Sequence, residues 1–173
     1  MRKESLQQIT QGGSSVALSG LRARGDIKGL LLVKRSYGPI IDAMTDTPGL
    51  ERISTTDNQN LLRMLDGKRM DYTIEYPYVL EYMRRQSTFR NELVTVPLAE
   101  TSKPLVGYVA CTRNAWGAAV MADIDKAIRG AARDEAYREA AVHWLPVEQQ
   151  TLYKTKFDEF FNQLATSPAF KAD

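Results

Sequence analysis

The feature that most constrains the fold of this chain is an alternation of short apolar runs with helical patterns between residues 28 and 97. The runs at 29–33, 50–53, 70–76 and 93–96 are typical of strands. Strands that alternate with helices usually form a mostly parallel sheet through right-handed crossovers. The sequence therefore predicts an α/β fold, and the first run, apolar throughout, is expected to be buried on both faces.

Local signals place the helices between these strands. Pro39 fits the first turn of a helix, and Pro77 opens another that runs to about residue 85. Thr55 or Thr56 is expected to cap the helix between them. That helix should stop at Gly67, which suits a backbone position with a positive φ.

The last third of the chain has a different pattern. An apolar run at 105–112, which contains Cys111, is expected to be a buried strand. Apolar stripes then predict three helices with core-facing sides, at 120–131, 134–145 and 157–164. This third is therefore expected to be helical after one strand.

Composition excludes several classes of protein. Hydrophobic residues make up 43% and charged residues 25% of the 173 residues, which is ordinary for a globular protein. No apolar run is long enough for a membrane helix, and none follows the basic residues at the N-terminus as in a signal peptide. Because the basic residues are scattered and not interleaved with aromatic ones, we do not expect a nucleic-acid partner.

The cysteine and histidine content argues against an enzyme. The chain has one Cys and one His, so it has no internal disulfide and little material for a metal site or a nucleophile–base pair. His143 falls on the surface or core edge of a predicted helix. We therefore expect no catalytic residues, no metal ligands and no cofactor.

The best candidate for a binding residue cluster follows the first strand. In open α/β sheets, ligands bind beyond the carboxyl ends of the strands. Arg35, Ser36, Tyr37 and Gly38 stand there, before a helix start. Free backbone N–H groups, the helix dipole and the Ser36 hydroxyl would attract an anion, with added charge from Arg35. An ordinary helix-capping turn is the alternative interpretation.

A second cluster ends the run at 70–76. Glu75 is expected on the polar face, where its carboxylate would take an ammonium group, and Tyr76 would stack on a ligand. A solvated strand end is the alternative. Thr55 and Thr56, at a third strand-to-helix junction, would line the same crevice. Together the clusters predict a cleft for a small zwitterion.

Several strings occur in an order and spacing similar to one family: 29–33, 35–38, 60–72, 94–98, 108–111, 116–117, 124–125, 137 and 144–145. Residues 28 to about 145 resemble the bacterial extracellular solute-binding proteins of family 3, which bind polar amino acids and have the two-lobed type 2 periplasmic fold. The family typically shows a helix that ends in Gly-Arg-x-Asp and then, four residues after the Asp, an acid; this chain has Gly67, Arg69 and Asp71 after the expected helix. The Asp of this pattern is Asp71, and the acid is Glu75.

The resemblance implies that the ligand lies between two lobes. Ser36 and the adjoining backbone would receive its carboxylate, and Glu75 would replace the acid, more often Asp, that holds its amino group. The domains would be a segment approaching the hinge (1–27), an α/β lobe (28–97) and a returning segment of the other lobe (98–173). The resemblance also implies a periplasmic location. It implies a membrane transporter of the ABC type, or a sensor, as the partner protein.

The chain also departs from the family. The resemblance implies a further segment before the strand at 29–33, which would supply most of the first lobe and an arginine for the ligand carboxylate. Without it, a sheet edge and an apolar helix face would be exposed, so we expect a homo-oligomer. The alternatives are a non-binding structural or dimer-forming lobe, and, less favoured, an enzyme on the same fold.

Overall fold

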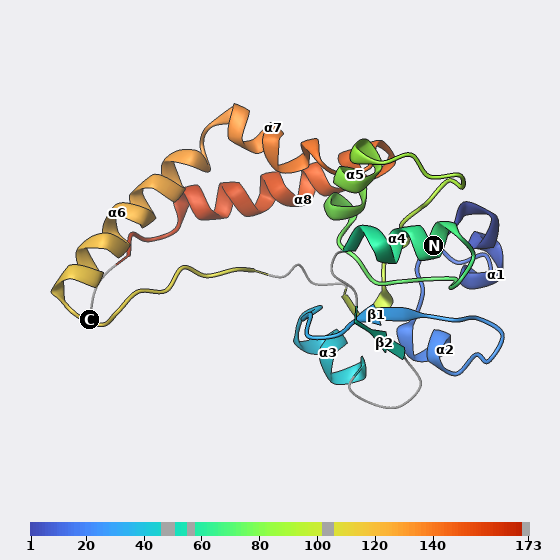
Figure 1. Cartoon of the computed structure of the whole chain (residues 1–173). Helices are drawn as coiled ribbons and strands as arrows, with labels where there is room; N and C mark the ends of the chain where they lie inside the picture. The colour runs from blue at the N-terminus through green and yellow to red at the C-terminus, as the bar shows by residue number, and fades with distance from the viewer. Residues whose placement is uncertain (46–50, 55–57, 102–105, 171–173) are drawn as a thin grey trace. The chain divides into compact units, whose positions relative to one another are not determined.

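The computed structural model describes residues 1–45, 51–54, 58–101 and 106–170 (Figure 1). The chain divides into two compact units, unit 1 (1–105) and unit 2 (106–173). Unit 1 contains the elements η1 (Lys3–Ser5), α1 (Leu6–Thr10), α2 (Leu18–Arg22), β1 (Leu30–Leu32), α3 (Pro39–Thr45), β2 (Glu51–Ile53), α4 (Asn58–Asp66), α5 (Pro77–Gln86) and η2 (Ala99–Thr101). Unit 2 contains α6 (Ala115–Ala131), α7 (Glu135–His143) and α8 (Val147–Thr166).

The centre of unit 1 is a two-stranded parallel sheet. β1 and β2 pair in the register Leu30↔Glu51, Leu31↔Arg52 and Leu32↔Ile53. All three residues of β1 are buried, which confirms the prediction of a strand covered on both faces. The mixed α/β class is thus confirmed, while the type 2 periplasmic fold remains a prediction.

Two hydrophobic clusters cover the two faces of β1. One face carries Leu31, which packs with residues of α1, α2 and α3. The other face carries Leu30 and Leu32, which pack with residues of α4 and α5. Figure 1 shows the same arrangement, with α4 on one side of the sheet and α2 and α3 on the other. Successive side chains of β1 point to opposite faces of the sheet, and the core of unit 1 is therefore divided into two clusters, one on each face.

The predicted strand at 70–76 is wrong except at one residue. Only Tyr72 pairs, in an isolated parallel bridge with Gly29. A Cβ atom at Gly29 would lie 2.3 Å from the Tyr72 ring, so this ring packs directly against the backbone of position 29, which has no side chain. Beyond the bridge, the Tyr76 N–H donates to the carboxylate of Glu75 (2.9 Å) and not to a neighbouring strand.

The predicted strand at 93–96 is likewise reduced to a bridge. Leu93 pairs antiparallel with Arg2, the Val94 N–H donates to the Met1 carbonyl, and the Lys3 N–H donates to the Glu92 carbonyl (2.8 Å). The N-terminal segment therefore forms the backbone hydrogen bonds with residues 92–94 that a neighbouring strand would otherwise form.

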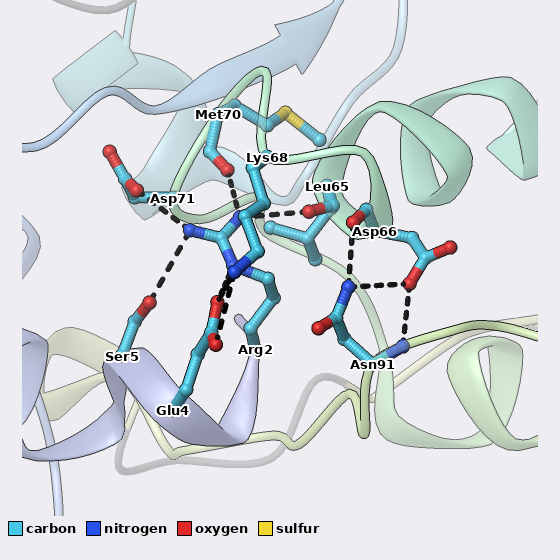
Figure 2. Close-up of polar contacts among 9 residues, drawn as sticks. All are labelled: Arg2, Glu4, Ser5, Leu65, Asp66, Lys68, Met70, Asp71 and Asn91. Carbon is cyan, nitrogen blue, oxygen red and sulfur yellow. Dashed lines mark hydrogen bonds and ion pairs between the residues drawn. The ribbon is translucent and has the colours of Figure 1, made fainter.

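Arg2 fastens this segment to the end of α4 (Figure 2). Its guanidinium donates to the carbonyls of Leu65 (2.8 Å) and Met70 (2.6 Å) and to the carboxylate of Asp71 (3.0 Å). The other oxygen of Asp71 accepts the Lys28 N–H (2.8 Å). The Asp of the Gly-Arg-x-Asp pattern is therefore a structural link between the N-terminus, the loop after α4 and the start of β1.

The end of α4 differs in detail from the prediction. The left-handed backbone position falls on Lys68, with φ 58°, and not on Gly67. The Gly67 N–H still closes the helix by donating to the Arg63 carbonyl (2.8 Å). α3 begins at Pro39 and α5 begins at Pro77 as predicted.

Unit 2 is built from the three predicted helices. Its core contains Ala132, Phe161 and Ala165, with Phe157 and Leu164 packed against them. Figure 1 shows α8 running alongside α6 and α7. The stripe on α6 is less buried than predicted, since Ile128 is 38% exposed. None of the helices in the described residues is long and apolar enough to span a membrane.

The prediction of a buried strand at 105–112 is wrong for the residues that the structure describes, 106–112. They form neither helix nor strand, and Tyr108 is 89% exposed. Cys111 is partly exposed and not a core residue. The physical reason is that no strand of the described chain pairs with this segment.

Candidate functional site

The candidate site is an ion pair between Arg35 and Glu75 in unit 1. Arg35 follows β1, and Glu75 follows the bridge at Tyr72. Because Gly29 and Tyr72 pair in parallel, the chain leaves both segments at the same edge. The Nη2 atom of Arg35 there donates to the Oε1 atom of Glu75. The fold thus joins two residues 40 positions apart that the sequence assigned to separate subsites.

Glu75 is largely buried. Its side chain is only 7% exposed, so the alternative of a solvated strand end is wrong. Burial raises the pKa of the Glu75 carboxyl, while the Tyr76 N–H and the nearby Arg35 guanidinium act to lower that pKa. A carboxylate in this position depends on its partners to stay ionised.

Both members of the pair keep unused hydrogen-bonding groups. Among the described residues, the Oε2 atom of Glu75 accepts no hydrogen bond, and the Nε and Nη1 atoms of Arg35 donate none. The Arg35 guanidinium also lies over the ring of Tyr37, 5.3 Å from its centroid. The site therefore offers a cation and an acid together, with the cation held over an aromatic ring.

Tyr37 lies beneath this pair and is a structural residue. It is 5% exposed, and its hydroxyl oxygen accepts the Leu32 N–H (3.0 Å). Burial raises the pKa of the Tyr37 hydroxyl. Tyr37 thus ties the turn after β1 back to the strand itself.

The turn at 36–38 does not present the free N–H groups that were expected. The Tyr37 N–H donates to Asp42 Oδ1 (2.8 Å), the Ser36 hydroxyl donates to Asp42 Oδ2, and the Gly38 N–H donates to Ser36 Oγ (3.2 Å). Asp42, in the first turn of α3, therefore occupies the anion position. The Ser36 hydroxyl and the Tyr37 N–H hold the pKa of the Asp42 carboxyl below its ordinary value.

Arg52 is a residue of this region that sequence reasoning missed. From β2 it donates to the carbonyls of Leu32 (3.2 Å) and Arg35 (3.3 Å) and to the Thr45 hydroxyl (2.7 Å). These bonds hold the backbone of the turn that carries Arg35. Arg52, placed by the sequence only in a short strand, gave no signal of such a role.

Tyr78 is the second missed residue. Its ring stacks on that of Tyr76, with centroids 5.4 Å apart and planes 12° apart, and it is 48% exposed. Burial, with the charges of Tyr76 and Glu75, raises the pKa of the Tyr78 hydroxyl. The spacing of two tyrosines around Pro77 was the available sequence signal.

The remaining predicted site residues and other cavities add little. Thr55 and Thr56 lie outside the described residues. Within those residues, no group of three or more His, Cys, Asp or Glu side chains is placed to hold a metal ion. An open hollow of about 420 Å³ in unit 2 is lined by Arg129, Arg133 and other residues of that unit. Both arginines are already bound to protein groups there.

Compared with protein-family models, with curated proteins and with solved structures, the chain gives no match. The resemblance to family 3 solute-binding proteins therefore stays a prediction from the sequence.

Proposed function

We propose that unit 1 binds a small zwitterionic solute, such as a polar amino acid, at the Arg35–Glu75 pair, and that it does so without catalysing a reaction. Arg35 would bind the carboxylate of the solute, and Glu75 would bind its ammonium group. The observation that carries the proposal is the pairing of two opposite charges that both retain unused hydrogen-bonding groups.

The energetics of the pair support an exchange with a ligand. An unpaired buried carboxylate is costly, so in the free protein Arg35 and Glu75 satisfy each other. A zwitterion separates its charges by a few bonds, so it can insert between the two side chains and pair with both. Each side chain then exchanges its charge-assisted bond to the other for one to the ligand. The unused Oε2 atom of Glu75 and the unused Nε and Nη1 atoms of Arg35 also gain partners.

The tyrosines supply the apolar part of the site. Tyr76 and Tyr78 present stacked rings beside Glu75, and Tyr37 lies under Arg35. An ammonium group over such a ring gains a further attraction, and the ring faces suit the hydrocarbon part of a ligand. The sequence-based role of Tyr76 as a ring that contacts the ligand belongs to this proposal.

The structure changes which groups we assign to the carboxylate. Because the carboxylate of Asp42 already binds the Ser36 hydroxyl and the Tyr37 N–H, we assign the ligand carboxylate to Arg35 and not to the turn. Thr55 and Thr56 remain candidates from the sequence alone. The periplasmic location and a partner of the ABC-transporter or sensor type rest only on the resemblance.

A structural module without a ligand is the second candidate. It is favoured by the filled anion position at Asp42, since an ion pair between two loops can simply fix those loops. The two candidates differ in one measurable respect. A structural pair stabilises unit 1 but binds nothing.

The test is calorimetric titration of the purified protein with the common L-amino acids and small carboxylates. We expect saturable binding of at least one compound that has both charges, and weaker or no binding of analogues that lack one of them. Arg35→Met and Glu75→Gln should each weaken that binding about 10- to 150-fold, since a hydrogen bond to a charged group contributes about 1.5–3 kcal/mol.

Arg24→Met is the matched control, because Arg24 forms an ion pair with Asp26, whose side chain is 56% exposed. It should leave the affinity unchanged. Absence of binding by any compound, in a protein with native circular dichroism, would overturn the proposed function and favour the structural module.

A further inference from the structure

The segment 106–112 has the composition of a strand but pairs with no strand in the described part of the chain. Its residues are Val106, Gly107, Tyr108, Val109, Ala110, Cys111 and Thr112, with no charge among them. β-branched and aromatic residues of this kind are enriched in strands. Figure 1 draws the segment as a long stretch without helix or arrow, leading into α6.

The backbone and side chains of this segment are available for contact. No N–H or C=O group of residues 106–111 forms a hydrogen bond with another residue that the structure describes. Val106, Tyr108 and Val109 are 46%, 89% and 48% exposed. An uncharged extended segment with unpaired backbone groups is a template for pairing with another strand, and natural proteins usually cover such an edge.

The sequence of the segment is complementary to itself. In an antiparallel pair centred on Val109, Tyr108 faces Ala110, and Gly107 faces Cys111 of the other copy. Val106 then faces Thr112, and Val109 faces its own counterpart. Large side chains thus lie opposite small ones, β-branched residues pair with each other, and no like charges meet.

We propose that residues 106–112 pair antiparallel with the same residues of a second copy of this chain, with Val109 on the two-fold axis. A two-fold contact uses the same patch on both chains, so it needs no separate complementary surface. The proposal is independent of ligand binding in unit 1. It also accounts for the strand character of a segment that has no strand partner among the residues that the structure describes.

Further apolar surface is available to stabilise the dimer. A two-stranded ribbon alone is marginally stable, and stable interfaces bury about 1,200 Å² or more. Ten of the fourteen large hydrophobic side chains that are exposed in the described residues belong to unit 2. Trp116, 66% exposed, stands only four residues beyond the segment. We therefore expect a dimer of micromolar affinity that buries this tryptophan as well.

A charge-exchange experiment tests the register. The unaltered protein should have twice the monomer mass at high micromolar concentration, measured by light scattering after size-exclusion chromatography. Val109→Lys and Val109→Glu should each be monomeric, because like charges would meet on the axis. An equimolar mixture of the two variants should recover the dimer, and Val109→Thr, which keeps a β-branched side chain, should remain dimeric.

A cross-link provides an independent test, since Cys111 is the only cysteine. In a Cys111→Ser background, Val109→Cys should form a dimer disulfide on mild oxidation. Cα atoms of directly opposed residues are about 4.5–5.5 Å apart, within the range of about 4.4–6.8 Å for a disulfide. Glu139→Cys, exposed on α7, is the control and should not cross-link.

Three results would overturn the proposal. The first is a monomeric unaltered protein at high micromolar concentration. The second is a dimer that persists in both charged variants. The third is a mixture of those variants that stays monomeric, because it would mean that the segment pairs with another part of the chain or with a different protein.

Discussion

Replacing Arg2 by methionine is expected to remove a large part of the stability of unit 1. Methionine fills a similar volume but offers no donor, so the carbonyls of Leu65 and Met70 would lose the guanidinium that binds them at 2.8 and 2.6 Å. The Arg2 side chain is only 6% exposed, so water does not readily replace it. Asp71 would keep its bond from the Lys28 N–H.

The magnitude follows from the burial of these bonds. Leaving a buried hydrogen-bonding group without its partner costs about 1–3 kcal/mol, so the carbonyls of Leu65 and Met70 together account for about 2–6 kcal/mol. The pair with Glu4, whose side chain is 49% exposed, adds at most about 1 kcal/mol. Since small domains unfold at a cost of about 5–15 kcal/mol, we expect the variant to lose a substantial part of the stability of unit 1.

Hydrogen exchange measured by mass spectrometry is the appropriate assay. Both tryptophans, Trp116 and Trp144, lie in unit 2, so their fluorescence reports on that unit and not on unit 1. Protection of the amides of β1 and α4 should fall by more than about one order of magnitude, because each 1.4 kcal/mol is about a tenfold change in the opening equilibrium.

The neighbouring Lys3→Met is the matched control. Lys3 pairs with Glu92 at the surface, where the side chains are 61% and 52% exposed. We expect it to change stability by less than about 1 kcal/mol. If Arg2→Met had an equally small effect, the buried network would not hold the N-terminal segment, and our description of unit 1 would be wrong.

Three further predictions concern the core and the turn after β1. Tyr37→Phe leaves the buried Leu32 N–H without its acceptor and should lower the free energy of unfolding by about 1–3 kcal/mol in urea denaturation; an unchanged midpoint would contradict that hydrogen bond. Gly29→Ala places a Cβ atom 2.3 Å from the Tyr72 ring. It should cost about 1–3 kcal/mol, whereas the same change at the unobstructed Gly25 should have little effect. Ser36→Ala removes a donor to Asp42 and should raise the pKa of that carboxyl toward its ordinary value, measured by NMR. A carboxyl whose pKa is lower in the folded than in the unfolded state stabilises the folded state at pH values above the unfolded-state pKa. This stabilisation disappears as the pH falls through the folded-state pKa. Because the Asp42 pKa is less lowered in the variant, the variant should lose less stability on acidification.

The sequence predicted the helices better than the strands for a physical reason. A helix satisfies its own backbone, so Pro39, Pro77 and the apolar stripe of α8 are sufficient to locate three of them. A strand needs a partner that its own sequence does not specify. The runs at 70–76 and 93–96 had the right residue types, but their ladders end after single bridges.

The candidate site was predicted in composition but not in arrangement. Arg35 and Glu75 were both identified, yet as separate subsites for opposite ends of a ligand. Sequence spacing does not show that a parallel bridge at Tyr72 brings them into contact. The acid that fills the turn, Asp42, had a signal that was overlooked, since an acidic residue in the first turn of a helix is favoured there.

The measurement that tests the central claim most directly is calorimetric titration of the full chain with the common L-amino acids, repeated with Arg35→Met and Glu75→Gln. Our account predicts saturable binding of at least one zwitterionic compound, weakened about 10- to 150-fold by either variant. Binding that is unaffected by both variants, or no binding to the folded protein, would contradict a ligand site at the Arg35–Glu75 pair.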